Sequence, residues 1–95
     1  MSLREILSNL AGQVAVATSD APDEYPEWSD GYEAHMADIK SLWASIRPQL
    51  KRDLEQAEFV DDKLREMFTA FDAGEKDKGR KAAWALYNAE VVNLR

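Results

Sequence analysis

The sequence predicts an all-α protein, a small bundle of about four helices. Apolar residues recur every three or four positions through most of the chain, which is the spacing of one helix face. No stretch of useful length alternates like a half-buried strand, and only four glycines and three prolines interrupt the 95 residues. We expect a single helical domain, 1–95, with helices at approximately 3–17, 30–47, 48–73 and 77–94 and an irregular acidic segment between the first two.

The first helix is expected to begin at residue 3 and to end near residue 17. Ser2 followed by Glu5 is the pattern of a capping box, in which each side chain satisfies a backbone amide of the first turn. One apolar stripe follows, made of Leu3, Ile6, Leu7, Leu10, Val14 and Ala17. Gly12 lowers helix stability by about 1 kcal/mol relative to alanine. The helix is therefore expected to depend on docking against the others.

Residues 18–28 are expected to be irregular, because Pro22 and Pro26 lack the backbone N–H that a helix needs. Asp30 and Glu33 offer a second capping box, which begins the second helix. Its apolar face spans about 120° at ~100° per residue. The residues on this face are Tyr32, His35, Met36, Ile39, Leu42, Trp43 and Ile46.

Pro48 predicts a sharp bend or break before the third helix, because proline fits the first position of a helix but not its interior. Gly74 is expected to cap the C-terminus of that helix. Two residues do not fit the apolar stripe of this helix: Asp61 lies within it and Phe59 lies on the opposite side. The other residues of the stripe are Leu50, Leu54, Ala57, Leu64, Phe68 and Phe71. Either the helix breaks at 58–61, or it is continuous and Phe59 is exposed. We favour a continuous helix.

The fourth helix is expected to bury Ala83, Trp84, Tyr87, Val91 and Leu94, which share one stripe. Arg80 lies one turn before Trp84, where its stem could cover the indole ring. Leu86 and Val92 fall off this stripe. Phe59, Leu86 and Val92 are therefore candidates for self-association, unless the helix phase is shifted by one residue and Phe59 and Leu86 belong to the core.

Composition excludes several kinds of site. The chain has no cysteine, so it can form neither a disulfide nor a thiolate metal site, which fits a reducing compartment and leads us to expect a cytoplasmic protein. No apolar run approaches the ~20 residues of a membrane span. A signal peptide is not expected, because Glu5, Ser8, Asn9 and Gln13 interrupt the N-terminal apolar residues.

Catalytic and metal-binding patterns are missing from the sequence. His35 is the sole histidine, no serine lies in a Gly-x-Ser-x-Gly elbow, and no Glu-x-x-His pair is present. Because His35 lies beside Met36 on the apolar face, we expect a core or boundary residue rather than a general base. We expect no enzymatic activity, no cofactor and no metal. Direct nucleic-acid binding is not expected either, since acids interrupt the basic run at 76–81.

Charge is distributed unevenly along the chain. Residues 1–46 contain eight acids and two bases, whereas residues 47–95 contain ten of each, so the whole excess of −6 lies in the first half. Six acids and no base fall between residues 20 and 33. The candidate partner-binding residues are Asp20, Asp23, Glu24, Tyr25, Glu27, Trp28, Asp30, Tyr32 and Glu33. Such a segment would attract a basic partner protein and repel a phosphate backbone.

A simpler interpretation of the same segment is a solvated connector, in which Tyr25 and Trp28 cover the core and the acids face water. The two interpretations can both hold. The sequence thus leads us to expect a non-enzymatic, acidic protein-binding module, an inhibitor, adaptor or regulator that engages a basic surface. Small acidic helical proteins of this type are common among bacterial and phage regulators. The alternative is a structural homo-oligomeric subunit, for example a homodimer. A small enzyme that uses His35 and nearby carboxylates is the least favoured hypothesis.

Overall fold

The computed structural model describes residues 2–21, 23–27 and 31–95, without the side chain of Val92. Four α-helices and two short 3-10 helices account for most of these residues, and no strand is found among them. In chain order the elements are α1 (Leu3–Ala17), α2 (Gly31–Ile46), η1 (Arg47–Gln49), α3 (Leu54–Asp72), α4 (Lys76–Asn88) and η2 (Val91–Asn93). The predicted all-α bundle of four helices is confirmed.

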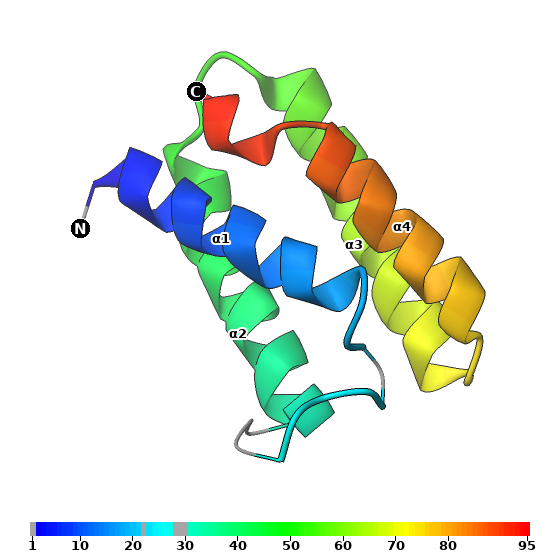
Figure 1. The fold of residues 1–95 in the computed structure, drawn as a ribbon. Coiled ribbons are helices and arrows are strands. Elements are labelled where there is room, and N and C mark those ends of the chain that lie inside the picture. The colour runs from blue at the N-terminus through cyan, green and yellow to red at the C-terminus, as the bar shows by residue number, and fades with distance from the viewer. Residues whose placement is uncertain (1, 22, 28–30) are drawn as a thin grey trace.

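The helices are arranged around one apolar core. Figure 1 shows α3 and α4 side by side as a hairpin, with α1 lying between α2 and α4. The C-terminal η2 returns to pack against α1. Buried side chains from all four α-helices join in one cluster, which also includes Ala21 from the acidic segment and Val91 and Leu94 from the C-terminal region. Among the described residues, no helix has both the length and the apolar character needed to cross a membrane.

Helix α1 follows its sequence pattern closely. The Ser2 hydroxyl accepts a hydrogen bond of 3.2 Å from the backbone amide of Glu5, which caps the first turn as expected. The helix buries Leu7, Leu10, Val14 and Ala17, all members of the predicted stripe. These side chains give α1 the docking energy that its sequence alone lacks.

The predicted start of the third helix at residue 48 is wrong. Pro48 lies inside the 3-10 turn η1, which confirms a bend, but α3 does not begin until Leu54. The backbone amides of residues 51–53 donate to the main-chain oxygen of Arg95 instead of entering a helix. This loop is therefore stabilised by a contact more than forty residues away in sequence, and Leu50 before it remains buried.

Helix α3 is continuous from Leu54 to Asp72, so the alternative of a break at 58–61 is wrong. Phe59 is 41% exposed, as expected for a continuous helix. At the other end Gly74 adopts φ +77, and the amide of Glu75 donates to the carbonyl of Ala70. That pair of features is a Schellman ending, which confirms the predicted role of Gly74.

The predicted stripe of the fourth helix is wrong by about one residue. Helix α4 buries Gly79, Ala82, Ala83 and Leu86, whereas Trp84 and Tyr87 are each 49% exposed. The helix also ends at Asn88 rather than 94, and Glu90 between α4 and η2 adopts the left-handed conformation with φ +53. Small residues allow α4 to approach α3 closely, so the position of the large rings did not mark its buried face.

Candidate functional site

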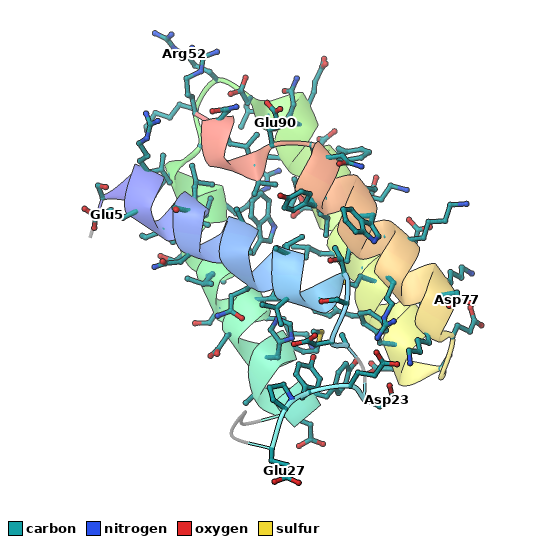
Figure 2. All side chains as sticks on the ribbon, in the orientation of Figure 1. Glu5, Asp23, Glu27, Arg52, Asp77 and Glu90 are labelled. Carbon is teal, nitrogen blue, oxygen red and sulfur yellow. The ribbon has the colours of Figure 1, made fainter. Side chains whose placement is uncertain are left out.

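The acidic segment between α1 and α2 is fastened to helix α4 by one arginine. Arg80 Nε donates to the carbonyl of Ala21 over 2.8 Å, and its Nη2 donates to the carbonyl of Ser19. Ala21 itself is fully buried. The guanidinium of Arg80 is therefore directed at the acidic segment, and a contact of its stem with Trp84 stays a prediction. Figure 2 shows this segment at the lower end of the molecule, between α2 and the α3–α4 hairpin.

Two of the candidate carboxylates have partners inside the protein. Lys76 Nζ lies 3.2 Å from Asp23 Oδ1 and also bonds Glu24 Oε1, while Arg80 Nη2 lies 3.2 Å from Glu24 Oε2. The hydrogen bonds from Lys76 and then Arg80 lower the pKa of Glu24, and the bond to Glu24 raises the pKa of Lys76. Asp23 and Glu24 are exposed, as the connector interpretation expects, but each forms an ion pair within the protein.

Tyr25 covers the core and bonds to His35. Its hydroxyl lies 2.6 Å from His35 Nδ1, while His35 Nε2 lies 2.8 Å from the carbonyl oxygen of Gln13. A carbonyl can only accept, so Nε2 carries the proton and, in the neutral ring, Nδ1 accepts from the phenol. Partial burial raises the pKa of Tyr25 to about 12. Tyr25 is therefore a lid that joins the segment to α1 and α2, as the connector interpretation expects.

His35 is a buried residue, 7% exposed, as expected from its position on the apolar face. Both ring nitrogens have partners within the chain, so neither is free to exchange a proton with a substrate in this arrangement. Among the described residues, no three histidine or acidic side chains converge to form a metal site.

Tyr32 has a similar structural role. Its hydroxyl donates to Asp72 Oδ1 over 3.0 Å, and its ring meets the ring of Phe71 edge-on at a centroid distance of 6.1 Å. Burial and the bond to Asp72 raise the pKa of Tyr32. Tyr32 therefore ties the start of α2 to the end of α3 and is a poor candidate for an interface anchor.

The remaining acids keep a negative surface at this end of the molecule. Glu27 and Glu33 are exposed and form no ion pair with any described residue, and Asp20 accepts from the neighbouring Ser19 hydroxyl. In Figure 2 the Glu27 side chain is directed away from the body of the protein. Trp28 and Asp30 lie outside the described residues. The sequence between residues 20 and 33 carries six carboxylates, and two bases of α4 pair with described members of this set, so the sum of these charges is four negative.

The candidates for self-association have different outcomes. Phe59 is exposed, Leu86 is fully buried and unavailable to a partner, and the side chain of Val92 lies outside the described residues. The structure instead exposes Trp84 and Tyr87, whose rings meet edge-on with centroids 5.6 Å apart. The helical spacing of the sequence predicted both rings in the core. The run of small residues at 79, 82 and 83 was the signal that could have indicated the true buried face.

Comparison of the chain with protein-family models, curated proteins and solved structures finds no match. Function must therefore be inferred from the chemistry of the chain's own residues.

Proposed function

We propose that this chain is a non-enzymatic, cytoplasmic protein-binding module, an inhibitor, adaptor or regulator, which engages a basic surface of a partner protein. The observation that carries the proposal is the charge excess at one end of the molecule. Lys76 and Arg80 balance only part of the six carboxylates between residues 20 and 33, and Glu27 and Glu33 remain exposed. An excess of this size accelerates encounter with a basic protein.

The internal bonds of the segment support this function. Arg80 and Tyr25 fix the main chain on the helical core before any partner arrives. A segment that is already ordered does not lose conformational entropy on binding, so more of the contact energy contributes to affinity. In this arrangement Asp23 and Glu24 hold the segment in place, and Glu27 and Glu33 are left for the partner.

The test measures association kinetics. A pull-down at low and at high salt identifies proteins whose binding depends on charge. Association of such a partner is then measured with wild type, with E27Q/E33Q and with the control E55Q/E58Q, which removes two exposed acids of α3. Asp23 and Glu24 are left unchanged because their loss would release the segment.

At low salt we expect E27Q/E33Q to associate roughly 3-fold to 10-fold more slowly than wild type, and we expect the difference to shrink at high salt. The control should stay close to wild type. Equal rates for wild type and E27Q/E33Q, or equal slowing by the control, would contradict the proposal.

A second candidate function is a structural homo-oligomeric subunit. Trp84 and Tyr87 on α4 and Phe59 on the neighbouring α3 each expose more than two fifths of their surface. Tryptophan and tyrosine are frequent anchors of interfaces, and a symmetric dimer would cover them. Light scattering should then report a dimer that W84S/Y87S converts to monomer, while L54S, which alters another exposed apolar residue, leaves it intact. A wild-type monomer at every concentration would exclude this candidate.

A further inference from the structure

A cleft at the end of the molecule opposite the acidic segment is bordered by positive charge. Its volume is about 680 Å³, and three segments far apart in sequence line it: the start of α1, the loop before α3 and the C-terminal residues. The floor includes Leu7 and Leu94, which are buried, and the rim includes Arg4, Lys51, Arg52 and Arg95. Four of the chain's twelve lysines and arginines thus border this cleft, and no aspartate or glutamate is among its lining residues, although acids outnumber bases by six.

The loop on this rim is held by an unusual set of main-chain bonds. The amides of Lys51, Arg52 and Asp53 all donate to the main-chain oxygen of Arg95, over 3.1, 2.9 and 3.1 Å. Successive amides that converge on one oxygen form the concave arrangement that proteins use to bind anions. Here the chain's own oxygen occupies it, which fixes Lys51 and Arg52 on the rim of the cleft.

Three of the four bases keep their charge available. Arg4, Lys51 and Arg52 form no ion pair with any described residue, whereas Arg95 lies 3.6 Å from Asp53 Oδ2. Arg4 also lies in the first turn of α1, where the helix dipole adds positive potential. Figure 2 shows Arg52 and Glu27 at opposite ends of the molecule, so the acids of residues 20–33 do not neutralise this cleft.

We propose that this cleft binds a small polyanion, a compound with two or more phosphate or carboxylate groups. A single phosphate would fill little of about 680 Å³, and bases from three segments can reach several anionic groups at once. Leu7 and Leu94 are buried and Leu3 is partly buried, so charge and hydrogen bonds at the rim are accompanied by some apolar contact. A long phosphate backbone fits less well, because the acidic end of the protein would repel it.

Calorimetric titration at low ionic strength tests this proposal, with tripolyphosphate and citrate as probes. The variant R4Q/K51Q/R52Q removes the three available charges of the rim. The control K63Q/R65Q/K78Q removes three bases that form exposed ion pairs within α3 or beside α4, so both variants change net charge equally. We expect the rim variant to weaken binding at least about 10-fold and the control less than about 2-fold.

The two probes distinguish the source of the anionic groups. Binding of both supports a general polyanion site, and binding of one assigns the cleft to phosphates or to carboxylates. In wild type, NMR shifts on titration should concentrate at residues 4, 51, 52 and 93–95, a readout that requires no variant. The proposal is overturned by no binding of either probe at millimolar concentration, by equal weakening in the control, or by tighter binding of a short oligonucleotide than of tripolyphosphate.

Discussion

The indole Nε1 of Trp43 donates a hydrogen bond of 2.6 Å to Oδ1 of Asp61, across the interface between α2 and α3. Arg47 Nε donates to the other carboxylate oxygen over 3.2 Å. Trp43 is 8% exposed, so its N–H has little access to water and needs this acceptor. The acid that interrupts the apolar stripe of α3 is therefore the partner of a buried tryptophan.

Replacement of Asp61 by alanine should destabilise the protein by about 1–3 kcal/mol, because it leaves the Trp43 N–H unpaired and removes the ion pair with Arg47. The neighbouring D62A is the control. Among the described residues Asp62 pairs with exposed Arg65 alone, so its loss should change the free energy of unfolding by less than about 0.5 kcal/mol. Urea unfolding of the two variants measures both values, and similar losses would refute this role of Asp61.

Two helical glycines should respond to alanine with opposite signs. A Cβ at Gly79 would overlap the ring of Phe71, which is itself packed in the core, whereas a Cβ at Gly12 would meet nothing within 4 Å. Alanine favours a helix interior by about 1 kcal/mol relative to glycine. G12A should therefore raise the free energy of unfolding by about 0.5–1 kcal/mol, and G79A should lower it by about 1–2 kcal/mol despite the same propensity gain.

Thermal or urea unfolding measures whether each alanine raises or lowers the free energy of unfolding. If G79A is as stable as G12A, α4 does not approach α3 as closely as the structure shows. Small residues on α4 would then not explain why its buried face excludes Trp84 and Tyr87.

Tyr25 should make the free energy of unfolding fall as pH rises in the alkaline range. The pKa of its phenol rises from 10.0 to about 12 in the folded protein, mainly through burial, so folding favours the neutral form. The stability that this shift contributes is complete below pH 10.0 and is lost as pH rises to about 12. The raised pKa values of Tyr32 and Lys76 act in the same direction.

The substitution Y25F removes the hydrogen bond to His35 and the titrating group together. At neutral pH it should lower the free energy of unfolding by about 1 kcal/mol, and above pH 10 its stability should fall less steeply than that of wild type. Y87F, at an exposed ring, is the control and should follow wild type throughout. Urea unfolding between neutral and alkaline pH provides the comparison, and parallel pH profiles for Y25F and wild type would contradict the prediction.

Local sequence patterns predicted the helix ends that depend on nearby residues. The ends of α1 and α2 agree with the predicted bounds to within about one residue, because the Ser2 cap, the prolines and the apolar period act over a few positions. The start of α3 and the end of α4 were missed for a different reason. The loop at 51–53 is held by Arg95, and Glu90 after α4 adopts a left-handed conformation; neither feature has a local signal in the sequence.

The acidic segment shows the same limit for a functional site. Its charge was evident from the sequence, but the pairing of Asp23 and Glu24 with bases about fifty residues away was not. Lys76 and Arg80 are four residues apart and therefore share one face of α4, which is a weak signal that they could act together. Without the topology, that face could not be assigned to the segment.

Arg80 should control the order of the acidic segment. Alanine at this position removes two hydrogen bonds to main-chain carbonyls and one ion pair with Glu24, so we expect a loss of about 1–3 kcal/mol in the free energy of unfolding. Amide exchange should accelerate at residues 23–25 more than in the helices. Lysine retains the charge but cannot reach both carbonyls with a planar fork, so R80K should recover only part of the loss.

The adjacent K81A is the control, because Lys81 is exposed and forms no ion pair with the described residues. It should match wild type in both measurements. If R80A unfolds at the same urea concentration as K81A, or if exchange accelerates equally throughout α4, Arg80 does not hold the segment. In that case Glu27 would not be presented on an ordered main chain, and association with a basic partner would require ordering of the acidic segment on binding.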